Sequence, residues 1–242
     1  MTASLLNSLL RALLRWGAAL AFCLPLRHRP HFWPRACGML FPLLLLALML
    51  DPLAQSTTLW QQQLLLLVLY VSFFALLGGM IYLCTDINKK GAMYCAVWSL
   101  LIAQCAYEGW CFLELYFSRH GHPLNMASPW AVLVQLLSGA GFFAVVYLLL
   151  TRRLPYKGEY HIGPRQLLSS FFIGILFMVQ AAVLDNFRVE QFPQSLVATI
   201  LIGQFYFITL LYFQSELFKK AAIEKERDAL NLLYERQRQQ YQ

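Results

Sequence analysis

The sequence predicts an all-α protein: a polytopic membrane bundle of six or seven transmembrane helices with a C-terminal, coiled-coil-like cytoplasmic helix. Three observations support this fold class. Of the 242 residues, 59% are hydrophobic and only 13% are charged, whereas soluble domains are roughly half apolar and about one quarter charged. The apolar residues fall into seven runs close to the ~20 residues that cross a bilayer. The basic residues are concentrated in alternate loops.

The first predicted span, residues 5–26, contains Arg11 and Arg15 one turn apart. It either crosses the membrane or lies partly on its surface as an amphipathic helix. We interpret it as a retained helix, because "RHRPHFWPR" follows it where a signal peptide would have small residues for cleavage. The remaining predicted spans are residues 36–53, 64–84, 91–117, 128–150, 167–185 and 195–218.

Basic residues fix the predicted orientation of these spans. The loops "RHRPHFWPR", "TDINKK" and "TRRLPYKGEYHIGPR" hold three, two and four Lys or Arg residues, and the segment after Phe218 holds six. Each of the alternate loops holds at most one. Since basic loops stay on the cytoplasmic side, we predict a multi-pass protein of the cell (plasma) membrane with its N-terminus outside and its C-terminus cytoplasmic. We therefore attribute the net charge of +7 to the loops that set the orientation of the protein in the membrane. Membrane lipid is the expected partner, and no nucleic acid partner is expected.

Polar residues inside the predicted spans gather towards the outer side. Ionisable residues in a span usually face the bundle interior or a water-filled cavity, so these residues predict a ligand-binding pocket that opens outside, with Tyr107 and Tyr116 as further aromatic contacts. Gln104 and Glu108 lie about 40° apart on one helix face, whereas Glu114 lies about 120° from Glu108. The alternative is that the glutamines only bond neighbouring helices together. The predicted ligand-binding residues are Gln104, Glu108, Trp110, Glu114, Gln135, Gln180 and Gln204.

Small residues at four-residue spacing predict where helices approach closely. Ala75 with Gly79, and Ala140 with Ala144 beside "SGAG", have this spacing. Such pairs let two helix backbones pack together in a membrane.

No catalytic motif occurs in the sequence, and no catalytic residue is predicted in this chain. The six cysteines lie within or at the ends of apolar runs, without the CxxC spacing of metal or redox sites. We therefore expect no metal and no cofactor in this chain, and treat the cysteines as small hydrophobic residues.

The polar C-terminal segment, residues 219–242, predicts a direct extension of the last span. Neither Gly nor Pro occurs between Phe213 and Gln242, so no residue of the kind that ends helices separates the two. The spacing favours a short, weak two-stranded coiled coil and hence a homodimer, although a solvated helix with a narrow apolar stripe also fits. We thus divide the chain into a sensor bundle, 1–218, and a signalling helix, 219–242. The predicted seam consists of Ile223, Leu230, Leu233 and Gln237, with Glu226 and Gln240 in the alternate places.

A short-looped bundle that leads into "LLYERQRQQY" (residues 232–241), together with the first inner loop "RHRPHFWPR", resembles a known family. It is similar to the N-terminal membrane sensor region of GHKL-class bacterial sensor histidine kinases of the peptide-pheromone-receptor type. The resemblance implies a receptor of a two-component system for signal transduction. Its partners would be an extracellular ligand, often a peptide, and a response regulator that acts through the kinase region.

The sequence departs from that family in one large respect. Full-length members are ATP-dependent protein histidine kinases that use ATP and Mg, yet no histidine follows Leu217 and the Asn- and Gly-rich ATP-binding motifs are missing. The resemblance therefore implies that a phosphorylated histidine helix and an ATP-binding domain would follow Gln242. The sequence leaves two alternatives open: a small integral-membrane transporter or permease component, which predicts inverted repeats, and a membrane scaffold without ligand.

Overall fold

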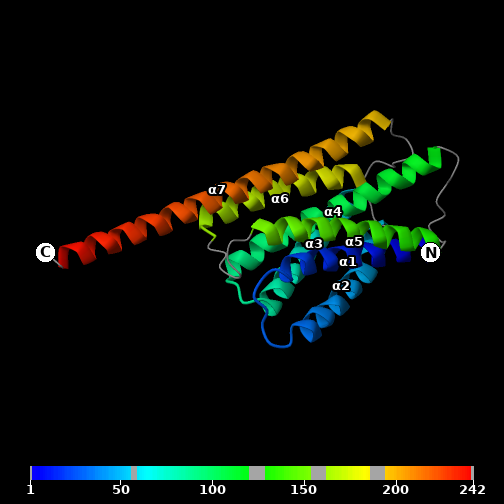
Figure 1. The fold of residues 1–242 in the computed structure, drawn as a ribbon. Coiled ribbons are helices and arrows are strands. Elements are labelled where there is room, and N and C mark those ends of the chain that lie inside the picture. The colour runs from blue at the N-terminus through cyan, green and yellow to red at the C-terminus, as the bar shows by residue number, and fades with distance from the viewer. Residues whose placement is uncertain (1, 56–58, 120–128, 154–161, 186–193, 241–242) are drawn as a thin grey trace. The chain divides into compact units, whose positions relative to one another are not determined.

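The computed structural model describes residues 2–55, 59–119, 129–153, 162–185 and 194–240, and within these ranges it consists of α-helices joined by short turns (Figure 1). An all-α fold is therefore confirmed for the described residues. The helices are α1 (Thr2–Cys23), α2 (Phe32–Gln55), α3 (Leu59–Cys84), α4 (Lys89–Arg119), α5 (Pro129–Arg153), α6 (Pro164–Asp185) and α7 (Gln194–Gln240).

Four of these helices are long and apolar enough to cross a membrane. The qualifying segments lie in α2, α3, α4 and α5, and the described part of α6 contributes a shorter apolar stretch, Pro164–Phe177. Each qualifying segment has at least the ~18 residues that a span of hydrocarbon requires. The structure is thus consistent with a membrane protein. The predicted total of six or seven spans stays a prediction.

Helix α1 lies inside the bundle formed by the other helices. It packs against α2, α3, α4 and α5, and Figure 1 shows it between α2 and α5. Small residues on several sides of it, among them Ala12, Ala18 and Ala19, are fully buried, which lets neighbouring helices approach from more than one direction. Helix α1 is therefore packed against four other helices. Its predicted placement, across the membrane or along the membrane surface, stays a prediction.

The contact between α1 and α5 depends on two glycines. A Cβ atom added at Gly139 would lie 2.6 Å from Cδ2 of Leu14, and one added at Gly17 would lie 3.0 Å from the ring of Phe143. The two helices therefore run in the same direction with Gly139 level with Leu14. This result corrects the predicted contact through Ala140 and Ala144, because both alanines are exposed and the glycine before them faces α1.

The turns at one end of the bundle are bonded to each other. Backbone N–H of Arg29 donates to the carbonyl of Cys84 over 3.0 Å, and that of Asp86 donates to the carbonyl of Arg27 over 2.9 Å. The Arg29 side chain also lies 3.8 Å from the Asp86 carboxylate. The α1–α2 and α3–α4 turns are two of the segments that the charge pattern assigns to one side of the membrane, and they lie at one end of the bundle.

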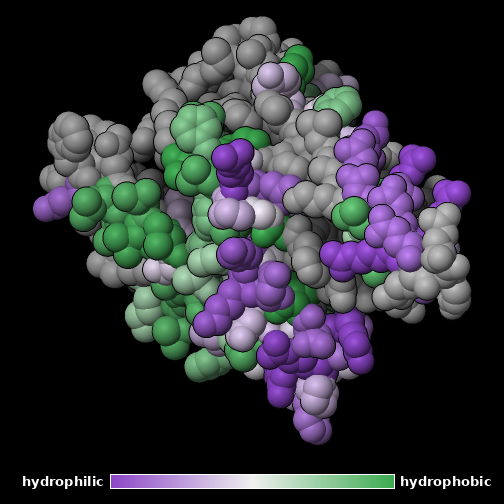
Figure 2. Space-filling model, turned by 90° about the vertical axis from the view of Figure 1, so that its left-hand side faces the viewer, coloured by the Kyte–Doolittle hydropathy of each residue, from purple (hydrophilic) through white to green (hydrophobic). Residues whose placement is uncertain are grey.

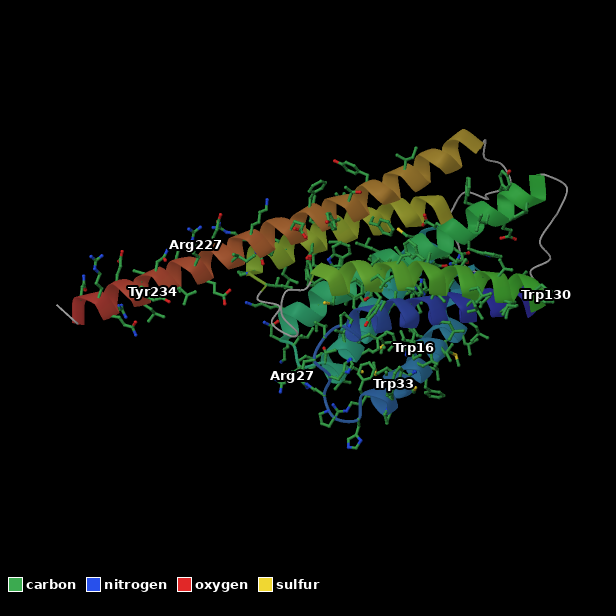
Figure 3. All side chains as sticks on the ribbon, viewed as in Figure 1. Trp16, Arg27, Trp33, Trp130, Arg227 and Tyr234 are labelled. Carbon is green, nitrogen blue, oxygen red and sulfur yellow. The ribbon has the colours of Figure 1, made fainter. Side chains whose placement is uncertain are left out.

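Polar and aromatic side chains mark the ends of the helical bundle. Arg27 and Trp33 lie near the end with the bonded turns, and Trp130 lies at the opposite end (Figure 3). Trp33 is 59% exposed and Trp130 is 74% exposed, as expected for Trp at a membrane interface. Figure 2 shows hydrophilic and hydrophobic side chains gathered in different areas of the surface in that view.

The chain divides into two compact units, Met1–Gln204 and Phe205–Gln242. The predicted division at residue 218 rests on a change of polarity and stays a prediction. Helix α7 is nevertheless continuous over 47 residues from Gln194 to Gln240, which confirms that the polar C-terminal segment extends the apolar helix before it.

We expect Gly139→Leu to destabilise the protein by about 1–3 kcal/mol, the usual cost of overpacking a tight contact. The new side chain would have to displace Leu14, whereas a Cβ atom added at Gly141 would meet no atom within 4 Å. Gly141→Leu is therefore the matched control and should leave stability unchanged. Thermal unfolding in detergent micelles measures both variants, and equal melting temperatures would contradict the proposed α1–α5 contact.

Candidate functional site

Two arginines of α1 point into the bundle and contact aromatic rings on different helices. The Arg11 guanidinium carbon lies 4.0 Å from the ring centroid of Tyr107 in α4, and its Nη2 donates to the Tyr107 hydroxyl. The guanidinium of Arg15 lies 3.9 Å from the ring centroid of Phe73 and 5.8 Å from that of Tyr70, both in α3. Arg15 is only 5% exposed. Four-residue spacing places both arginines on one face of α1.

A second polar pair lies beside Tyr107 on α4. The Gln104 side-chain N–H donates to Oε1 of Glu108 over 2.9 Å, as residues four apart on a helix are expected to do. Gln104 is buried and Glu108 is half-buried. We call Arg11, Arg15, Gln104, Tyr107 and Glu108 the buried polar cluster. Its contact between α1 and α4, from Arg11 to Tyr107, joins residues that are 96 positions apart in the sequence.

The depth of the arginines explains why they need partners. Helix α1 has 22 residues and is therefore about 33 Å long, with Arg11 and Arg15 near its middle. A charge buried in an apolar surrounding costs several kcal/mol unless it is paired and hydrogen-bonded. A desolvated cation–π contact contributes about 2 kcal/mol, and a hydrogen bond to a charged group about 1.5–3 kcal/mol. The observed contacts thus offset costs of the same size.

Two further predicted site residues are almost fully buried. Trp110 on α4 and Gln135 on α5 are each 2% exposed. Trp110 Nε1 and Gln135 Nε2 have no hydrogen-bond partner within the described part of the chain. Gln135 lies one turn before Gly139, and Gly139 is level with Leu14, so Gln135 lies at the height of Arg11. Both unpartnered atoms are donors.

The structure does not bring every predicted residue to this cluster. Glu114 is half-buried further along α4 and lies about 120° around the helix from Glu108. Tyr116 is exposed and packs edge-on against Phe117, and its predicted role as an aromatic contact stays a prediction. The side chains of Gln180 on α6 and Gln204 on α7 fall outside the described residues, and their predicted roles stay predictions.

The predicted dimer residues lie on the polar part of α7. Ile223, Leu230 and Leu233 are exposed apolar side chains, and Glu226 and Gln237 are exposed as well. Figure 3 shows Arg227 and Tyr234 on this same stretch of helix. An exposed apolar stripe along a charged helix has the composition of a coiled-coil face.

Sequence reasoning does not place Arg11 and Arg15 in the candidate site, nor the rings of Tyr70 and Phe73. The available signal is two ionisable residues at four-residue spacing in an otherwise apolar helix. When other helices enclose such a helix, its ionisable residues are candidates for a functional site. From the sequence they equally suit an amphipathic surface helix, because the sequence does not show that four helices surround α1.

The fold and the cluster together define a class: a helical protein consistent with membrane insertion, with ionisable side chains gathered inside its bundle. Groups of three or more His, Cys, Asp or Glu side chains suited to a metal ion are absent from the described residues. Comparison with known proteins adds no closer identity. No protein-family profile, curated protein or solved structure matches the chain.

We expect Tyr107→Phe to lower the free energy of unfolding by about 1.5–3 kcal/mol, because it removes the acceptor of a charged hydrogen bond. Tyr107→Leu should lower it further by about 2 kcal/mol, since the aromatic ring beneath Arg11 is lost as well. Unfolding titrations with a denaturing detergent measure the series. Tyr116→Phe at an exposed ring is the control, and a loss as large as that of Tyr107→Phe would contradict this assignment.

Proposed function

We propose that this chain is the membrane sensor module of a two-component sensor histidine kinase. It passes an extracellular signal, often a peptide in the family it resembles, through its last membrane helix to a cytoplasmic kinase region outside this sequence. In this proposal all seven helices α1 to α7 contribute spans, the N-terminus is outside, the C-terminus is cytoplasmic, and the module works as a homodimer in the plasma membrane.

The observation that carries the proposal is the continuity of α7. Its first part has the apolar residues of a span, its second part is charged and exposed, and the helix runs unbroken over 47 residues. A helix transmits displacement along its axis because every turn is hydrogen-bonded to the next. A signal-binding domain joined to the output region by a flexible linker would not be connected to it through one continuous helix.

The buried polar cluster supplies the input side of the proposal. A ligand shifts a protein between two arrangements only if it binds them with different affinity. Arg11, Tyr107 and Glu108 lie on two helices that pack directly against each other. A ligand that competes for their hydrogen bonds would favour a different packing of α1 against α4, which is the differential affinity that sensing requires.

A membrane transporter or permease component is the second candidate. Buried ionisable side chains on α1 and α4 favour it, because such residues also mark substrate and proton pathways. A transporter needs no dimeric output helix. The arrangement of the polar part of α7 therefore separates the two functions.

We expect Leu233→Cys and Leu230→Cys, each in a chain whose six native cysteines are replaced, to form a disulfide between two copies in membranes. Both positions belong to the predicted seam, where Cα atoms of two helices approach closely enough for a disulfide. Leu232→Cys is the control, since it is equally exposed but lies outside the seam. Non-reducing gels measure the dimer fraction. Equal cross-linking at all three positions, or none, would remove the support for a dimeric output helix.

A further inference from the structure

We propose that one end of the bundle binds the phosphate head group of an anionic phospholipid. This end, which we call the basic end, consists of the α1–α2 and α3–α4 turns with the first turns of α2 and α4. The inference goes beyond the sensor role, since it requires only that the apolar helices lie in a membrane. The cations of the basic end are Arg27, Arg29, Arg35, Lys89 and Lys90.

Hydrogen bonds bring these cations to one place from different parts of the chain. The backbone N–H of Asp86 donates to the carbonyl of Arg27 over 2.9 Å, and Lys89 follows Asp86 by three positions at the start of α4. Nη1 of Arg35 donates to the carbonyl of Leu83 over 2.9 Å, which connects the first turn of α2 to the end of α3. The basic end is therefore a surface made by two turns that are bonded together.

Positive charge exceeds negative charge on this surface. Asp86 is the one carboxylate in residues 24–40 and 82–93, and it lies 3.8 Å from Arg29. Arg27, Lys89 and Lys90 are exposed and have no ion pair or hydrogen bond from their side chains among the described residues. These three cations are free to bind phosphate oxygens, which accept hydrogen bonds from guanidinium and ammonium groups.

The short turns keep the cations close to the ends of the helices. Four residues separate α3 from α4, and eight separate α1 from α2. The polar head-group layer on each side of a bilayer is about 5–7 Å thick. If the apolar helices cross the hydrocarbon, the cations lie at the depth of the lipid phosphates, where basic residues beside membrane helices bind anionic head groups.

Exposed apolar side chains next to the cations favour a lipid over a soluble anion. Leu83 is 43% exposed, and its carbonyl accepts the Arg35 bond. Trp33 is 59% exposed, and Figure 3 shows it near the same end of the bundle as Arg27. A phospholipid has the matching order of groups, a phosphate followed by acyl chains, whereas an acidic protein segment supplies the charge without the chains.

The test measures lipid binding to the purified full chain in detergent by native mass spectrometry. Dioleoyl-phosphatidylglycerol and dioleoyl-phosphatidylcholine have the same acyl chains, but only the first has a net negative head group. Each Lys or Arg beside an anionic head group contributes about fivefold to binding, so two contacts should make phosphatidylglycerol bind at least about 25-fold more tightly. A preference below about fivefold would overturn the proposal.

Variants assign the preference to the basic end. Arg27→Gln, Lys89→Gln and Lys90→Gln combined should reduce it to about fivefold or less, since Arg35 is then the one cation there without a carboxylate beside it. Lys89→Gln with Lys90→Gln is a milder variant, in case the triple variant does not fold, and should lower the preference at least about fivefold. An unchanged preference in the folded variants would overturn the assignment.

A control variant removes the same charge elsewhere. Arg227→Gln, Arg236→Gln and Arg238→Gln combined change three exposed arginines on the polar part of α7, and this variant should keep the full preference for phosphatidylglycerol. An equal loss in both triple variants would assign the preference to the net charge of the chain and overturn the site at the basic end.

Two soluble probes distinguish the lipid from other anions. Glycerol 3-phosphate has a phosphate without acyl chains, and hexaglutamate represents an acidic protein segment. At about 1 mM, neither should displace phosphatidylglycerol, because neither has acyl chains to cover the exposed Trp33 and Leu83 side chains. Displacement by glycerol 3-phosphate would overturn the lipid in favour of a soluble phosphate, and displacement by hexaglutamate would overturn it in favour of an acidic protein partner.

Discussion

The burial of two arginines in the middle of an apolar helix is the constraint on which the rest of this structure depends. A guanidinium buried in an apolar surrounding costs several kcal/mol unless it has partners, so the helices around α1 have to supply them. Tyr107 on α4 and Phe73 on α3 supply them. Close approach of α5 then requires glycine where it crosses α1, and Gly139 lies at that point. The polar cluster and the glycine contact thus both lie along α1.

The same constraint links stability to function. Residues that hold Arg11 and Arg15 in place are contributed by helices distant in sequence, so a change in the charge of the cluster alters the packing of those helices against α1. A polar cluster of this kind stabilises one arrangement of a bundle as long as its hydrogen bonds are satisfied. In the proposed sensor, a ligand that offers competing hydrogen bonds would favour another arrangement.

Much of the fold follows from the sequence because hydrophobic length and helix-breaking residues are local signals. The helices match the apolar runs within a few residues, and the absence of Gly and Pro after Phe213 predicts the unbroken α7. The pairing of Gln104 with Glu108 also follows, since four-residue spacing places them on one face. The sequence does not show which helices are neighbours in the bundle. The enclosure of α1, the roles of Tyr70 and Phe73, and the outward position of Tyr116 all depend on tertiary packing that no periodicity in one chain encodes.

The charge pattern and the structure agree about the ends of the bundle. The basic α1–α2 and α3–α4 turns are bonded through Arg29 and Cys84, so two segments assigned to one side by their charge lie together. Trp33 and Trp130 lie near opposite ends, where amphipathic rings suit a membrane interface. The two basic turns therefore lie at one end of the bundle, and the side of the membrane that this end faces stays a prediction.

The most direct test of the central claim is the phosphorylation of a chimera in which Gln242 continues in frame into the dimerisation helix and ATP-binding domain of a sensor kinase. Autophosphorylation in membrane vesicles would be compared between the native bundle and Arg15→Gln at equal protein levels. If the buried cluster controls the output helix, the substitution should change the phosphorylation rate at least about fivefold, the lower range of allosteric coupling. Equal rates in a folded, equally abundant chimera would contradict the account.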